Sequence, residues 1–455
     1  MMPISADLRS RRLRSGRATG LAVGLFAALT LLTGCDLFFG DPEAPPLPGE
    51  RISVLKMSSA LVIDPTLAQQ QVVLPKPETN PDWPQPGGYS THAMYHLALG
   101  DNIRTAWTAK IGQSAGDERA ILAEPVSAGG RVFTMDAGAT VTAFDLTNGG
   151  QVWRVDLTPE DENDDLFGGG LASDGKMLYV TTGYEHVYAL DASNGAVAWD
   201  VDLRAPLRAP PTYSDGRIFV VTVDNQVIAL AADDGRKLWT HVGVPPQAAL
   251  LGGAAPAVAG PNVIVPLSTG EVLAIRAETG RVLWTESLAG GQRSESLSQL
   301  ADVRGRPVID RDLVVAVSHS GVTAAIDLAN GRRVWTNNFG GSQSPWAAGD
   351  YIYMLTREGD VLCLTRDQGR IRWVQSLPTF EDMEGKKGPI YWSGPVLAGD
   401  RLIVTGSNSD AYSISPYTGE ILGKIELPGR SHLPPIIVNG TLLMVTDNAE
   451  LVALR

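Results

Sequence analysis

Eight side chains of this 455-residue sequence carry the groups most often used as metal ligands or nucleophiles, namely two cysteines and six histidines. The histidines are scattered and show no metal-ligand spacing. They are His92, His96, His186, His241, His319 and His432. No Ser/His/Asp order, phosphate loop or EF-hand pattern accompanies them. The sequence therefore predicts no catalytic residue, no cofactor site and no metal site.

An acidic run at residues 160–165 is the one stretch whose charge could attract Ca²⁺. It lacks the glycine and the ligand spacing of a calcium-binding loop. We interpret the run as a solvated loop.

The first cysteine, Cys35, stands at the end of a targeting segment. Five arginines lie between residues 9 and 17, and an apolar run of twelve residues, 21–32, follows them. That run is too short for a comfortable membrane span and fits a signal peptide. The ending Leu32-Thr33-Gly34-Cys35 resembles a bacterial lipobox, which implies cleavage before Cys35 and lipidation of its thiol. A plain signal peptide with a chance cysteine is the alternative.

Several acyl chains on Cys35 would anchor the protein stably, at roughly 0.8 kcal/mol per buried CH₂. Asp36 directly follows, and in the common lipoprotein-sorting pattern this residue retains a lipoprotein at the inner membrane. The sequence therefore predicts a lipid-anchored periplasmic protein, and Asp36 leaves the inner membrane open as its location. The formal charge is −13, and removal of residues 1–34 with their five arginines and one aspartate leaves −17, which argues against nucleic acid as a partner.

Residues 35–80 contain seven prolines and little periodicity, which predicts a Pro-rich tether behind the lipid. Short strands at 53–55 or 61–63 remain an alternative within it. We expect the folded domain to span residues 81–455, with a lead-in segment at 81–102.

A repeat of about 45 residues organises the rest of the chain. In its first copy, alternating small apolar residues lead to Asp145, a turn centred on Gly149 follows, and Trp153 comes four residues after the glycine. Further copies end at Trp199, Trp239, Trp284, Trp335 and Trp373, and a weaker copy has Gly423 at the tryptophan position. The glycines suit hairpin turns with positive φ, and the tryptophans suit packing between neighbouring repeats.

Each copy is preceded by two more β signals, so one unit predicts four strands. The last copy, 451–455, lacks its outer strand, while the segment around Trp107 has an outer strand and no partners before it. The sequence predicts an all-β fold, an eight-bladed β-propeller of four-stranded antiparallel blades, closed by pairing of the N- and C-terminal segments. Seven blades is the lesser alternative.

The repeat resembles the propeller repeat of pyrroloquinoline-quinone (PQQ) proteins, on the match Ala189-Leu-Asp191-Ala-Ser-Asn-Gly195-Ala-Val-Ala-Trp199. That repeat serves quinone-dependent periplasmic dehydrogenases and also the BamB family, lipoprotein subunits of the machinery (BAM) that inserts β-barrels into the outer membrane. Many of the dehydrogenases place two adjacent cysteines beside the quinone. Here Cys363 lies mid-strand, at a position where other copies have alanine.

The BamB family fits the lipobox, the length and the repeat number together, and the segment from Trp83 to Gly88 with His92-Ala-Met looks like its alphaproteobacterial members. The resemblance implies a non-enzymatic scaffold on the periplasmic face of the outer membrane. It would dock the periplasmic domains of the barrel-inserting subunit BamA, beside other BAM subunits and unfolded barrel clients. A PQQ-dependent dehydrogenase, or a propeller for another envelope partner, is the alternative function.

The resemblance also implies a partner-binding site on two neighbouring inter-blade links. The first contains Leu250 and Leu251, and the second contains Asp302 and Arg304. Leu250 and Asp302 agree with the family pattern, whereas Leu251 replaces an arginine and Arg304 replaces an aspartate. The alternative is that Leu250 and Leu251 simply begin an inner strand.

Overall fold

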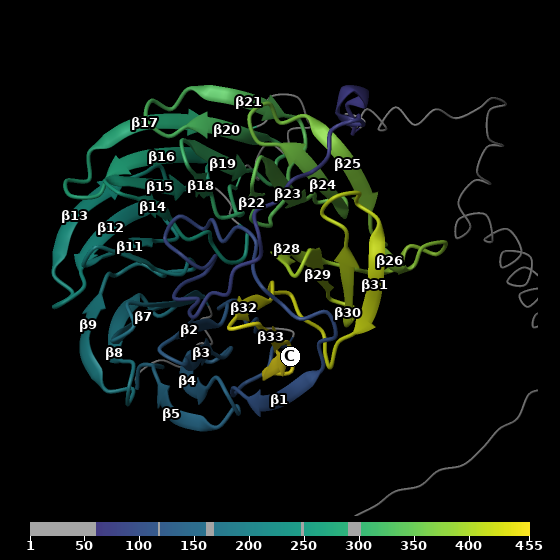
Figure 1. The fold of residues 1–455 in the computed structure, drawn as a ribbon. Coiled ribbons are helices and arrows are strands. Elements are labelled where there is room, and N and C mark those ends of the chain that lie inside the picture. Colours follow the sequence, from purple (N-terminus) through teal and green to yellow (C-terminus); the bar gives the residue numbers. More distant parts are fainter. Residues whose placement is uncertain (1–60, 117–118, 161–167, 247–249, 290–301) are drawn as a thin grey trace, which may run out of the picture. The chain divides into compact units, whose positions relative to one another are not determined.

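The computed structural model describes residues 61–116, 119–160, 168–246, 250–289 and 302–455. Within them, eight antiparallel four-stranded sheets stand around a ring (Figure 1). This confirms the predicted eight-bladed propeller. Among the described residues, no helix has the length and apolar character needed to cross a membrane.

Seven blades use four strands in chain order, from the innermost to the outermost. Blades 1 to 3 are β2 (Val126–Ala128) to β5 (Gln151–Asp156), β6 (Gly169–Ser173) to β9 (Val197–Asp202) and β10 (Thr212–Ser214) to β13 (Lys237–Val242). Blades 4 to 6 are β14 (Ala257–Ala259) to β17 (Val282–Ser287), β18 (Val308–Asp310) to β21 (Arg333–Asn337) and β22 (Trp346–Ala348) to β25 (Ile371–Ser376). Blade 7 is β28 (Trp392–Ala398) to β31 (Ile421–Glu426).

The eighth blade closes the ring with both ends of the propeller chain. Its inner strands are β32 (Ile436–Val438), β33 (Thr441–Thr446) and β34 (Glu450–Leu454), and its outer strand is β1 (Thr105–Lys110). β1 pairs antiparallel with β34, from Thr105 opposite Leu454 to Lys110 opposite Glu450. The predicted closure is therefore confirmed, and the hydrogen bonds between β1 and β34 hold the ring shut.

Each repeat tryptophan joins its blade to the next one. The indole N–H donates to a backbone carbonyl just after the third strand of the following blade, at 2.6–3.3 Å. The donors and acceptors are Trp107 to Leu146, Trp153 to Ala192, Trp199 to Ala232, Trp239 to Ala277, Trp284 to Leu328, Trp335 to Arg366 and Trp373 to Pro416. Seven of the eight joints between blades therefore use the same kind of contact.

The turn glycine of the next blade lies directly under each indole. All seven turn glycines have φ between +62° and +80°, and a Cβ added to any of them would fall 2.5–2.8 Å from an atom of the tryptophan before it. Glycine is required both for the left-handed turn and for the close approach of the ring. The glycine-centred turns predicted from sequence thus have a second function in the packing between blades.

The joint from blade 7 to blade 8 differs because β1 supplies the outer strand of blade 8. Blade 8 therefore has no turn from its third strand, β34, to its fourth. No turn glycine is present to receive an indole, and Gly423 stands at the tryptophan position with no atom within 4 Å of an added Cβ. The missing tryptophan therefore follows from the closure of the ring.

Residues 61–80, which we assigned to the tether, lie on the propeller instead. Ile63 forms a parallel bridge with Ile371 of β25, Leu67 is buried, and Asp64 caps the short 3-10 helix η3 (Pro65–Leu67). The hydroxyl of Tyr351 in blade 6 donates to the carbonyl of Gln71 at 3.3 Å. The chain thus joins the folded unit earlier than the boundary at residue 80. Cys35 and the segment 53–55 lie outside the described residues.

The lead-in segment becomes a channel plug, which we define as residues 78–99. It crosses the middle of the ring and hydrogen-bonds to the first strand of every blade or to the turn after it (Figure 1). In blade order, the pairs are Trp83 with Ser127, Pro84 with Ser173, Gln85 with Tyr213, Ser90 with Val258, Thr91 with Ile309, Tyr95 with Trp346, Leu97 with Leu397, and Asn80 with Asn439. The plug thus satisfies backbone groups that the inner strand edges would leave unpaired.

We expect two glycine-to-alanine substitutions to distinguish a joint that has the tryptophan–glycine contact from the joint that lacks it. Gly331→Ala should lower the free energy of unfolding by about 1–3 kcal/mol, because φ is +77° and the new Cβ would meet Trp284 at 2.7 Å. Gly423→Ala should be neutral or stabilise by up to about 1 kcal/mol, because the strand position is open. Urea unfolding followed by tryptophan fluorescence measures both. Equal losses in the two variants would contradict the joint described above.

Candidate functional site

The two links predicted to bind a partner lie side by side on one face of the ring. The first connects β13 to β14 and the second connects β17 to β18, so they flank blade 4. The backbone N–H of Leu250 donates to the Asp302 carboxylate at 3.1 Å, and the Arg304 guanidinium donates to the Leu251 carbonyl. The structure therefore brings all four predicted residues together. We call this the link face, since all connections between blades lie on it.

Asp302 points into the protein rather than outward. Its exposed fraction is 4%, and its backbone carbonyl accepts the N–H of His319 at 2.9 Å. Burial raises the pKa of the Asp302 carboxyl, while the Leu250 N–H and the charge of Arg304 oppose that rise. Asp302 therefore fixes the first link to the second, and it offers no exposed carboxylate to a partner.

Leu251 is the most accessible of the four side chains, with an exposed fraction of 41%. Leu250 is half-buried and lines a hollow of about 30 Å³ that continues to Asp302 and Val303. The inner strand β14 begins only at Ala257, so neither leucine belongs to a strand. An exposed leucine on a link that its neighbour holds in place is a suitable anchor for a partner.

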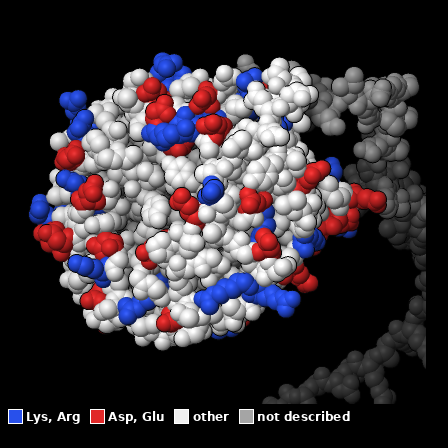
Figure 2. Space-filling model, in the orientation of Figure 1, with Lys and Arg blue, Asp and Glu red and all other residues white. Residues whose placement is uncertain are grey.

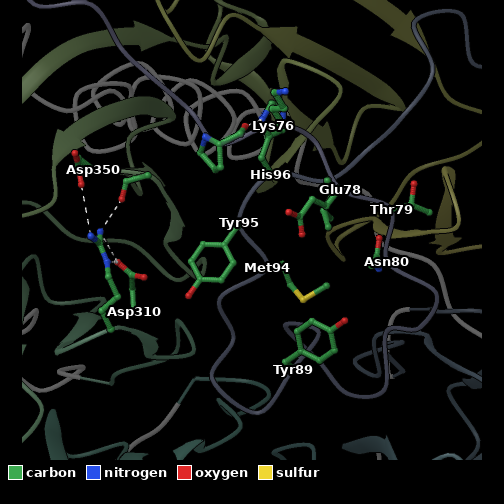
Figure 3. A pocket seen from close by; sticks show the side chains of 14 residues that line it. Lys76, Glu78, Thr79, Asn80, Tyr89, Met94, Tyr95, His96, Asp310 and Asp350 are labelled. Atoms are coloured by element: carbon green, nitrogen blue, oxygen red, sulfur yellow. Dashed lines mark hydrogen bonds and ion pairs between the residues drawn. The ribbon is translucent and has the colours of Figure 1, made fainter.

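The opposite face of the ring carries the plug and a hollow of about 440 Å³ (Figure 3). Tyr89, Met94 and Tyr95 border it from the plug. Asp310, Arg311 and Asp350 border it from the turns of blades 5 and 6, and Arg311 forms ion pairs with both aspartates. In the space-filling view the middle of the ring is filled and most charged side chains lie toward the rim (Figure 2). This hollow could not be predicted from sequence, because its walls come from three separate segments.

Two small hollows occur along the channel between the plug and the link face. Their volumes are about 30 and 70 Å³. Pockets that enclose a small organic ligand usually measure roughly 300–1,000 Å³. Neither of these two hollows, as the described residues line it, has the volume of such a pocket.

Two titratable side chains of the interior, Cys363 and His92, take part in packing. Cys363 of β24 is fully buried, and burial raises the pKa of its thiol. His92 lies buried in the plug with Nδ1 2.8 Å from the Pro307 carbonyl, and burial lowers the pKa of its imidazole to about 3. Within the described ranges, no three or more His, Cys, Asp or Glu side chains are grouped to hold a metal ion. The acidic stretch 161–165 lies outside those ranges.

The long link between blades 6 and 7 forms a hairpin of β26 (Phe380–Asp382) and β27 (Lys387–Pro389). Figure 1 shows the hairpin at the outer side of the ring, beyond β31. It therefore does not cover the central channel.

Eight four-stranded blades joined through tryptophan and glycine define a β-propeller of the PQQ-repeat class. The sequence pattern of the family described as outer membrane protein assembly factor BamB matches residues 137–375, which is more than half of the chain. The chain therefore belongs to the BamB family.

Individual relatives agree with this assignment. BamB of Yersinia pestis is 28% identical over 299 residues, which cover 65% of this chain and 75% of the relative. BamB of Escherichia coli K12 is 28% identical over 345 residues, which cover 75% of this chain and 86% of the relative.

Two solved structures show the same fold. The crystal structure of BamB from Moraxella catarrhalis matches with a TM-score of 0.66 and 19% identity, over 78% of this chain and all of that one. The quinohemoprotein alcohol dehydrogenase of Comamonas testosteroni matches with a TM-score of 0.64 and 13% identity, over 82% of this chain and 80% of that one. Because the two carry different functions, the shared fold does not decide between them.

We expect Asp302→Ala to loosen the first link without unfolding the ring. A hydrogen bond to a charged group is worth about 1.5–3 kcal/mol, so the amide of Leu250 should lose roughly tenfold or more of its protection against hydrogen exchange. Exchange measured by mass spectrometry on peptides covering 250–256 reports the change, and peptides of β29 (Arg401–Gly406) serve as the control. Unchanged exchange at the first link would show that Asp302 does not hold it.

Proposed function

We propose that this protein is a non-enzymatic scaffold subunit of the machinery that assembles β-barrel proteins in the outer membrane, acting from the periplasmic side. Membership of the BamB family supports this proposal, because the relatives are named as outer membrane protein assembly factors. The observation that carries it furthest is the arrangement of the links: Leu251 stands exposed on a segment that Asp302 and Arg304 fix from the neighbouring link.

The partner that fits this role is the periplasmic part of the barrel-inserting subunit, BamA, with the remaining subunits and unfolded barrel clients around it. Leu251 would make the outermost apolar contact, Leu250 would lie behind it, and Asp302 and Arg304 would hold the shape of the surface. Lipidation at Cys35 would keep the scaffold at the membrane where the machinery works. This division of roles differs from the sequence expectation, in which Asp302 itself touched the partner.

A catalytic role has less support. The plug occupies one end of the channel, and the hollows that remain on the channel are too small for the quinone of the related dehydrogenases. The described residues support a function in binding rather than in catalysis.

The test substitutes a charge for the exposed anchor. Leu251→Asp should weaken binding of the BamA periplasmic domains about thirtyfold or more, since an interface hot spot contributes roughly 2 kcal/mol or more. The matched control is Leu422→Asp on β31, where the leucine is 58% exposed. Affinity is measured by titration of the full chain in detergent, and circular dichroism checks the fold. Equal affinities for Leu251→Asp and the unsubstituted chain would remove Leu251 from the interface. Asp302→Arg is a poorer probe, because it places a charge in a buried position.

A further inference from the structure

Three arginines line the mouth of the central channel on the link face. Arg208 precedes β10, and Arg304 and Arg306 lie in the link before β18. All three border one hollow of about 70 Å³, together with Glu124 and the glycines 252 and 253. The hollow therefore adjoins the first link immediately after Leu251.

Two of these arginines are already held in place. Arg306 pairs with the buried carboxylate of Glu124 at 2.5 Å, and its backbone N–H donates to Ser344. Arg304 donates to the Leu251 carbonyl, and its guanidinium would lie 3.2 Å from a Cβ added at Gly252. The positions of both charges are thus fixed before any ligand arrives, which lowers the entropic cost of binding.

The positive charge at the mouth is not fully balanced by the described residues. Glu124 serves Arg306, and Asp302 lies near Arg304. Burial lowers the pKa of the Arg304 guanidinium even though the charge of Asp302 opposes it. Arg208 is exposed and has no hydrogen-bond or ion-pair partner within the described ranges, and the Nε of Arg306 is buried without an acceptor. His432, the remaining basic side chain here, is paired with Asp447 at 3.0 Å.

We propose that this mouth is a carboxylate-binding site, and that its occupant is an acidic side chain of the protein that docks on Leu251. The inference rests on the proposed function, since it names the chemistry of that same partner. A planar guanidinium binds a carboxylate through paired N–H donors, and arginine is the side chain best suited to this contact. A hollow of about 70 Å³ has room for one such group.

A protein carboxylate fits the site better than a polyanion does. The chain carries a formal charge of −13, so an extended polyanion is repelled by the molecule as a whole. A single acidic side chain instead reaches a local excess of positive charge while the apolar contact forms beside it. The charge pair then fixes the register of docking and accelerates association.

The experiment reverses the charge of Arg208. Of the three arginines at the channel mouth, it is the one without a hydrogen-bond or ion-pair partner among the described residues. The full chain in detergent is titrated with the BamA periplasmic domains of the same organism at 50 and 500 mM NaCl. Arg208→Glu should raise Kd at least tenfold at 50 mM, with a smaller effect at 500 mM because salt screens the pair. Arg208→Lys should restore much of the affinity. The matched control is Arg236→Glu, since Arg236 is 65% exposed in the β12–β13 turn of the same blade.

The outcomes separate the inference from the proposed function. If the unsubstituted chain fails to bind the BamA domains, the proposed function is wrong. If it binds and Arg208→Glu behaves like Arg236→Glu, the carboxylate site is wrong while the function stands. Neutralising the acidic stretch 160–165 gives a third arm. A tenfold gain in affinity there would mean that this stretch, rather than the partner, supplies the carboxylate, and would also overturn the inference.

Discussion

The contact between a tryptophan and the turn glycine of the next blade is the interaction on which the rest of the structure depends. A four-stranded blade cannot bury both of its faces alone, so each blade is stable only against its neighbours. The indole supplies apolar area and also donates one hydrogen bond to a carbonyl of the next blade. Because the glycine lacks a side chain, the ring can lie directly on the turn.

A ring built from such joints has two further requirements, and other parts of the chain meet both. Blade 8 receives only three strands from the C-terminal segment, and β1 completes it by pairing with β34. The inner strand edges face the channel, and there the plug supplies hydrogen bonds to all eight blades. The repeats stabilise the ring. The connections on the link face differ in length and lie outside the repeats, so their sequences can vary and they can bind a partner.

The fold could be predicted from sequence because its determinants are local. The spacing of Asp145, Gly149 and Trp153 specifies a turn and an aromatic packing residue within nine residues, and repetition then sets the number of blades. The plug could not be predicted in this way, because it binds mainly through backbone groups to strands that lie up to 359 residues away, as Asn80 and Asn439 show. Its Trp83-Pro-Gln-Pro-Gly-Gly motif marked a lead-in segment without indicating where that segment lies.

The proximity of the four candidate residues could be predicted. The family resemblance assigned Leu250, Leu251, Asp302 and Arg304 to neighbouring links, and the structure brings them together. The direction of each side chain was not accessible, because it depends on contacts between links. Asp302 turns inward, and its carboxylate accepts the Leu250 N–H of the other link. The third arginine of the channel mouth, Arg208, lies on another link and shares no motif with the other two.

We propose that partners dock on the link face, whereas the repeats and the plug have structural roles. Site-specific photo-crosslinking in living cells is the sharpest test, with a photoreactive residue placed at Leu251 in one strain and at Tyr89 of the plug in another. We expect a covalent adduct with BamA from position 251 and none from position 89. An adduct from position 89 with none from position 251 would show that partners dock elsewhere.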